Sequence, residues 1–371
     1  MNTKHTYRYL YRWTGCLICL LCLLSGLVAC SDTEDPDLFP EKMVTLSLRL
    51  NTGNFVTRAG TDPSAIRTVG VIVLEKKEND TYQYQYLATP VQNEENNRYE
   101  IRLYPTDQPV KLSLIANMED LSSLLTALTT GSGTTTEEEI REALLVSFEN
   151  GTLEELPMYG EVVYENGITE ASTSIEEISM LRSMATVKVS LVESLFEDET
   201  FLLKSIQAYR TNDRIQVIPD PTAFYENEDE DETEWKVITP SVPQTAGSTI
   251  TTPSVNAGNS TVQSLGPVYL PESETKTDII SEATCLIIGG VYKGDGYETS
   301  TRTTYYRIDF KNASGEPTGQ ILRNHFYAIE ISAVNGPGTT HPEEADEKDI
   351  IVKITNWEES EHEIDDLGKT D

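Results

Sequence analysis

The sequence predicts a mainly β protein, built from two β-sandwich domains with a short helical insertion in the first. A length of 371 residues with 38% hydrophobic content is enough for two domains, each with its own core. Short apolar stretches of strand length recur along the chain, and Asn, Asp, Gly and Pro separate them. A strictly alternating stretch begins this series, as expected of a strand with one buried face.

That first stretch covers residues 44–50 and gives the clearest strand pattern in the chain. Its apolar side chains are Val44, Leu46, Leu48 and Leu50. Because side chains alternate between the two faces of a strand, we expect these four to point into a core.

The remaining strands follow from the same pattern. In the first domain they are expected at residues 68–74, 82–88, 99–104 and 110–116, and in the second at 184–192, 201–209, 214–218, 284–292, 303–310, 325–333 and 350–354. The polar segment 220–266 is expected to be a surface loop with one short strand near residues 235–238. We place the domain boundary near residue 174, which gives domains of residues 59–174 and 175–371.

Two helices are expected inside the first domain. Leucines at positions 121, 124, 125 and 128 fall on one helical face, and apolar residues recur at intervals of three and four in residues 137–148. Thr135 and Glu138 have the spacing of a capping box at the start of the second helix.

The first thirty residues have the pattern of an export signal. Lys4, Arg8 and Arg12 precede an apolar run over residues 16–29 that is too short to span a bilayer. The run ends in Leu-Val-Ala before Cys30, which resembles the lipobox of bacterial lipoproteins, and we interpret Cys30 as the lipidated residue. The alternative is an ordinary secretory signal with an incidental cysteine. The acidic residues that follow Cys30 indicate an extended tether.

Cys285 is the one cysteine that lies beyond this segment, which holds the other four. An intrachain disulfide is therefore excluded after residue 30. Since Cys285 stands in an apolar run, we expect a buried strand residue and not a nucleophile.

Composition and motifs disfavour several classes of function. A formal charge of -33 would repel nucleic acid, and a chain with four histidines and no nucleophile elbow is unlike a serine hydrolase. There is also no P-loop or dinucleotide motif, so we predict a protein that is not an enzyme and needs no cofactor or metal. The acidic run 226–232 lacks the spacing of a calcium loop, which favours a solvated loop over a calcium site.

Tyrosines offer an alternative function. Residues 82, 84, 86, 305 and 306 are tyrosines, and such rings can stack on sugars or simply line one face of a strand. A surface glycan-binding lipoprotein is therefore the second hypothesis.

The sequence Lys-Gly-Asp-Gly-Tyr at residues 293–297 indicates a hairpin turn.

Five phrases together resemble the Bacteroidales fimbrillin family, the fimbrial subunit lipoproteins of those bacteria. They are LPMYGE at residues 156–161, LRSMATVKV at 181–189, YLPE at 269–272, YYRI at 305–308 and LRNHFYAI at 322–329. These phrases follow a lipobox and an early Arg-Ala step, and together, in this order and spacing, they extend over most of the chain.

The resemblance implies a transthyretin-like or immunoglobulin-like β-sandwich fold and export to the outer membrane as a lipoprotein. It also implies trimming by an arginine-specific surface protease, for which the matching position here is Arg58-Ala59. An ordinary loop arginine is the alternative. Cleavage there would remove residues 31–58, and with them the alternating strand at 44–50.

If that strand is removed, we expect the subunits to assemble by strand exchange. The open groove would bind a strand of the same pattern from another subunit. The candidate donor carries Ile350, Val352 and Ile354, with residues 336–348 as its hinge, although this strand could also be the last one of its own sandwich. The predicted partners are other fimbrial subunits, and the predicted function is adhesion by a fimbria; a tip or accessory subunit is the alternative within the family.

N-terminal sequencing of the protein from intact cells tests the two processing sites. We expect the mature chain to begin at Ala59, with a blocked precursor that begins at the lipidated Cys30. A mature chain that begins elsewhere would contradict the cleavage assignment.

Overall fold

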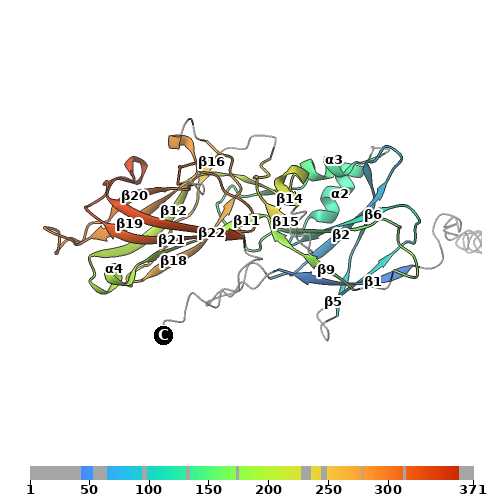
Figure 1. Ribbon diagram of the computed structural model, residues 1–371, viewed down its shortest axis with the longest axis horizontal. Coiled ribbons are helices and arrows are strands. Elements are labelled where there is room, and N and C mark those ends of the chain that lie inside the picture. The colour runs from blue at the N-terminus through green and yellow to red at the C-terminus, as the bar shows by residue number, and fades with distance from the viewer. Residues whose placement is uncertain are drawn as a thin grey trace, which may run out of the picture. The chain divides into compact units, whose positions relative to one another are not determined.

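The computed structural model describes residues 43–52, 65–93, 98–130, 134–172, 175–226, 235–243, 249–276, 278, 280–311 and 315–358 (Figure 1). Cys30, Arg58, Ala59 and almost all of the acidic run 226–232 lie outside these residues. Within them the chain is mainly β, as predicted. No helix of the described part is long and apolar enough to cross a membrane.

Two sheets form an N-terminal sandwich. One has the order β4 (Val91–Asn93), β5 (Arg98–Leu103), β1 (Val44–Asn51), β9 (Ile175–Ser179), and the other has the order β10 (Leu181–Arg182), β8 (Met158–Tyr164), β6 (Val110–Ala116), β2 (Val69–Lys76), β3 (Tyr82–Ala88). A buried cluster joins side chains of both sheets, among them Leu46, Ile101, Val71 and Leu112. These alternate with exposed residues along β1 and β5, which is why each strand has one core face.

A second pair of sheets forms a C-terminal sandwich. One has the order β18 (Ser264–Pro271), β11 (Met184–Leu191), β21 (His325–Val334), β22 (Ile350–Glu358), and the other has the order β16 (Thr249–Thr251), β12 (Phe201–Asn212), β19 (Cys285–Tyr292), β20 (Thr304–Asp309), with β17 (Val255–Asn256) also on β12. A separate cluster that includes Phe201, Tyr306 and Ile329 fills the space between them.

The two sandwiches repeat one arrangement around their first strand. β1 lies between antiparallel β5 and parallel β9. β11 likewise lies between antiparallel β18 and parallel β21. The C-terminal sandwich adds β22 on the outer side of β21.

Both predicted helices are present, as α2 (Leu121–Thr129) and α3 (Glu137–Ala143), and they pack on the outer face of the β2–β6 sheet (Figure 1). The second helix is shorter than predicted. After Leu144, which has a non-helical backbone, residues 145–147 form β7 (Leu145–Ser147) and pair with β13 (Arg214–Gln216). A long-range strand pairing thus overrides the helical periodicity of this segment.

The capping box of α3 is present one residue later than predicted. The hydroxyl of Thr136 accepts a hydrogen bond from the Glu139 amide, and the Glu139 carboxylate accepts one from the Thr136 amide at 2.8 Å. Thr135 is instead buried, and its carbonyl accepts a hydrogen bond from the Tyr84 amide.

The structure contains strands that the sequence patterns did not predict. β8, β9, β10 and β18 were not expected, and because β9 and β10 pair with β1 and β8, the N-terminal sandwich continues to Arg182, past residue 174. Segment 220–266 holds the expected strand as β15 (Trp235–Val237), but also β14 (Phe224–Glu226), β16, β17 and the start of β18. The expectation of an almost strandless loop was therefore wrong.

The position of the capping box can be tested with two neighbouring glutamates. Glu138 and Glu139 both lie in the first turn of α3, so both interact with the helix dipole, but only Glu139 closes the box. We expect Glu139→Ala to lower the free energy of unfolding by about 1 kcal/mol and Glu138→Ala by less than half as much. Urea titrations measure both; equal losses would contradict the assignment.

Candidate functional site

The candidate site is the position that β1 fills in the N-terminal sandwich. The strand pairs antiparallel with β5 over residues 44–48 and parallel with β9 over residues 47–51. It is therefore an interior strand with a ladder of hydrogen bonds on each side. The predicted strand at residues 44–50 is confirmed as a paired part of a sandwich.

Side chains from β1 fill the core beneath it. Leu48 is fully buried, Leu46 and Val44 are nearly so, and Leu50 is half-buried against the same cluster. Thr45 and Arg49 point outward, and Arg49 forms an exposed ion pair with Glu177 on β9 at 3.9 Å. The burial of β1 thus depends on its apolar face.

The C-terminal end of β1 has one further anchor. The Asn51 carbonyl accepts a hydrogen bond of 2.7 Å from the amide of Met180. Residue 52 is the last described residue before Arg58, and the described chain resumes at residue 65. A cut at Arg58 would leave β1 attached to the sandwich through non-covalent contacts alone.

β22, the candidate donor strand, occupies a different position. It pairs antiparallel with β21 and lies at the end of its sheet, so it has a ladder on one side. Ile350 is buried, while Val352 and Ile354 are half-buried against the core. These three residues alternate with exposed ones, as the apolar residues of β1 do.

Residues 335–349, which connect β21 to β22 and are called the strap here, run against β20. The backbones of Thr339 and Tyr305 exchange two hydrogen bonds of 2.9 and 3.0 Å, and the Arg307 amide donates to the Asp346 carbonyl at 2.9 Å. The Tyr306 hydroxyl donates to the Gly336 carbonyl at 2.9 Å. The segment expected to be a free hinge is therefore bonded along its length to a neighbouring strand.

A buried ion pair lies where the two sandwiches meet. The Arg323 guanidinium donates to Glu272 through Nε at 2.8 Å, and its two terminal nitrogens donate to the carbonyls of Val217 and Gln216 at 2.9 and 2.7 Å. Gln216 is on β13, which pairs with β7, the strand that follows α3 in the chain. Burial raises the pKa of Glu272, and the Arg323 charge opposes that rise.

Four of the five phrases that carry the family resemblance meet at this junction. Besides Arg323 and Glu272, the Ser183 amide donates to the Pro157 carbonyl at 2.9 Å, and the Asn324 amide donates to the Met184 carbonyl at 3.0 Å. Local sequence patterns do not show that these phrases lie together in the fold. In the sequence, Glu272 and Arg323 each stand close to the end of an apolar strand. A charged residue in such a position is the sequence signal that indicates a buried ion pair.

The tyrosines expected on one strand face are divided between two. A bulge in β3 places Tyr82 and Tyr84 against the helix-side cluster and Tyr86 against the sandwich core. Tyr306 is buried as well. These residues do not form an exposed platform for sugars.

Cys285 is confirmed as a buried residue of β19. Burial raises the pKa of its thiol, which opposes formation of the thiolate. Among the described residues, no group of three His, Cys, Asp or Glu side chains converges as metal ligands.

Comparisons with known proteins bear on the fold. A candidate cell adhesion protein from Bacteroides eggerthii superposes with a TM-score of 0.51 at 16% identity, over 86% of this chain and 97% of its own. The two chains share a fold. Family models and curated proteins give no match.

Two further structures are similar. The tip fimbrial protein Mfa3 from Porphyromonas gingivalis, with a C-terminal truncation, has a TM-score of 0.49 at 11% identity over 85% of this chain and 100% of its own. A fimbrilin from the same species has a TM-score of 0.48 at 17% identity over 84% and 96%.

Loss of one partner of the buried ion pair is expected to destabilise the junction. Glu272→Gln leaves the Arg323 charge buried, so we expect the free energy of unfolding to fall by about 3–5 kcal/mol. Glu177→Gln, which removes an exposed partner of Arg49, is the matched control and should cost less than about 1 kcal/mol. Urea unfolding measures both, and similar losses would contradict the role of burial.

Proposed function

We propose that the chain is a structural subunit of a cell-surface fimbria that assembles by exchange of β-strands. In this proposal Cys30 carries a lipid that holds the precursor at the outer membrane, and an arginine-specific surface protease cuts between Arg58 and Ala59. Cleavage frees β1, and a strand from another subunit takes its place. The observation that carries the proposal is the interior position of β1 in its sheet. The C-terminal end of β1 is joined to the following strands through the chain segment that contains Arg58.

The position of β1 makes its absence costly. Burial of Val44, Leu46 and Leu48 contributes about 5–9 kcal/mol, taking roughly 1.5–3 kcal/mol for each side chain. Removal would also leave the facing edges of β5 and β9 without partners in the gap. An empty slot of this kind favours a replacement strand strongly.

β22 has the pattern that the slot requires. Its inward residues Ile350, Val352 and Ile354 match the alternation of β1, and its nine residues are enough to cover the eight of β1. A strand that moves from a sheet end to an interior slot exchanges one ladder for two. Its half-buried residues would also become fully buried, so the transfer is favourable.

The strap limits how much of the C-terminal segment can leave its own subunit. Because the strap is bonded to β20, the point about which β22 can turn lies at the end of the strap, next to Ile350. The whole of β22 is then available to a neighbour, while the strap stays with its own subunit.

The fold comparison supports a surface role without specifying the assembly. The Bacteroides eggerthii protein, which shares the fold, is named as a candidate cell adhesion protein. Together with the phrases that resemble the fimbrillin family, this favours a non-enzymatic surface subunit.

Limited digestion tests the proposal. The purified exported chain is treated with an arginine-specific protease and examined by gel electrophoresis without boiling. We expect a ladder of polymers after cleavage, and no ladder from Arg58→Gln, which should remain uncut at that position. A chain that is cut after Arg58 and stays monomeric would overturn the proposal.

A disulfide lock separates cleavage from donation. Glu330 and Lys353 are register partners on β21 and β22 with exposed side chains, so cysteines at both positions can bond across the pair. We expect the oxidised double variant to be cleaved without forming polymers and to polymerise after reduction. Glu330→Cys alone is the control; polymerisation of the locked form would exclude β22 as the donor.

A further inference from the structure

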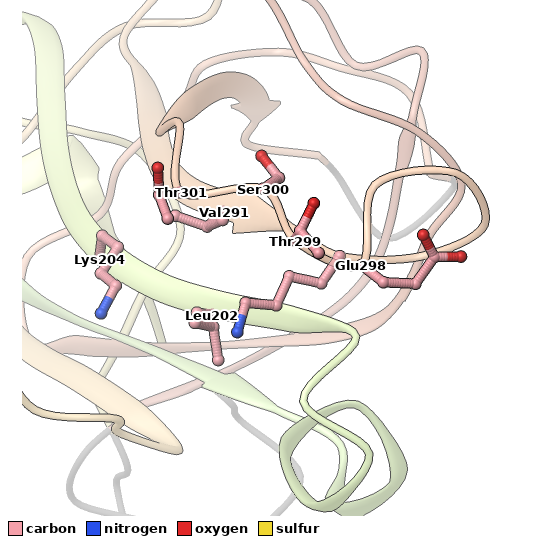
Figure 2. Close-up of a pocket in the computed structure, with 8 residues that line it drawn as sticks. Leu202, Lys204, Val291, Glu298, Thr299, Ser300 and Thr301 are labelled. Carbon is pink, nitrogen blue, oxygen red and sulfur yellow. The ribbon is translucent and has the colours of Figure 1, made fainter.

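The loop between β19 and β20, residues 293–303, carries features that strand exchange does not use. Two adjoining hollows of about 300 and 200 Å³ lie along it and share Ser300 in their walls. Figure 2 shows the first, with Lys204 on its strand and the Glu298 carboxylate pointing away from Lys204. The second lies between this loop and the strap, which contributes Pro337, Gly338 and Thr340.

An exposed aromatic ring forms part of the second hollow. Tyr297 is 45% exposed, and its ring centre lies 5.5 Å from that of the largely buried Tyr292. Packing on Tyr292 restrains the Tyr297 ring, while nearly half of this side chain remains exposed. A fixed aromatic face beside hydroxyl groups suits a ring that is apolar on one side and polar at its rim.

The loop is ordered by its own hydrogen bonds. The Tyr297 amide donates to the Gly294 carbonyl and the Ser300 amide donates to the Tyr297 carbonyl, each at 2.8 Å. Hydrogen bonds from the backbone amide of Glu298 itself and from the Gly296 amide, the latter at 3.0 Å, stabilise the Glu298 carboxylate and lower its pKa. Gly296 has a φ of +81°, a conformation that favours glycine. The site is thus formed before any ligand arrives.

Basic side chains outnumber acidic ones in the two hollows. Lys204, Lys293 and Glu298 line the first hollow and Arg302 lines the second, and none of the three cations forms an ion pair with another described residue. The chain has 61 acidic and 28 basic side chains, so carboxylate partners are abundant elsewhere. Three cations against one carboxylate in the walls of two adjoining hollows favour an anionic ligand.

We propose that the two hollows bind an acidic oligosaccharide, a chain of pyranose rings that carries carboxylate groups. One ring lies against Tyr297 with its carboxylate at Arg302, and the hydroxyls of Ser300 and Thr340 are available to its rim. The next part of the saccharide lies in the hollow of the two lysines. This binding is independent of strand exchange, because neither β1 nor β22 lines either hollow.

Calorimetry on the uncleaved, monomeric exported chain tests the proposal, with 3′-sialyllactose as the probe and lactose as its neutral counterpart. We expect binding of sialyllactose at least about tenfold tighter than that of lactose, since a charge-assisted hydrogen bond is added. Arg302→Gln should abolish this difference and leave lactose binding unchanged. Lys188→Gln, which removes an exposed cation on β11, is the matched control and should change neither.

Tyr297 variants test the ring contact. We expect Tyr297→Ala to weaken sialyllactose binding about tenfold and Tyr297→Phe, which keeps the ring, to weaken it less than about twofold. Unchanged melting temperatures would show that these exposed substitutions leave the fold intact. Equal affinity for lactose, or binding of inorganic polyphosphate that is as tight as that of sialyllactose, would overturn the proposal. Since the protein is uncleaved, either result stands whether or not the subunits polymerise.

Discussion

The N-terminal sandwich depends on an occupied position between β5 and β9. An edge strand can leave a sheet and cost one ladder, but a strand in this position supplies hydrogen bonds to two neighbours and side chains to the core below. Backbone amides and carbonyls that lose these hydrogen bonds raise the free energy of the folded state, unless another strand or water takes the place of the lost partners. The sheet therefore requires a strand there, while the chemistry of the strand is specified only by its alternation.

β22 and the strap divide two tasks within the C-terminal sandwich. The strap is fixed to β20 through backbone bonds and through the Tyr306 hydroxyl, so its position follows from the sandwich core. β22 continues from it with fewer constraints, since its outer edge has no neighbour in the described sheet. The same strap also forms one wall of the hollow beside Tyr297. The hollow beside Tyr297 and the candidate donor strand are thus adjacent in sequence but supported by different contacts.

Local patterns in the sequence were enough to find β1, β3 and β6, because strict alternation or a continuous apolar run marks a strand without reference to its partners. They failed where tertiary contacts decide. Residues 145–147 have helical periodicity but pair with β13, and the bulge in β3 turns Tyr86 to the opposite face. Likewise, the Arg323–Glu272 pair joins residues 51 positions apart, which no local pattern can connect. The alternation of Ile350, Val352 and Ile354 predicted a strand, but its place at the end of a sheet came from the fold.

The repeated arrangement of the two sandwiches has a consequence for growth. β11 has the same position in its sheet as β1 has in the other sandwich. The described chain continues from β11 into β10 at one end and into α4 (Glu193–Glu197) at the other. A single cut therefore cannot release β11. Under the proposed strand exchange, each molecule would offer one acceptor position and one donor strand, in different sandwiches. A fibre assembled in this way would be unbranched, and its two ends would be chemically distinct.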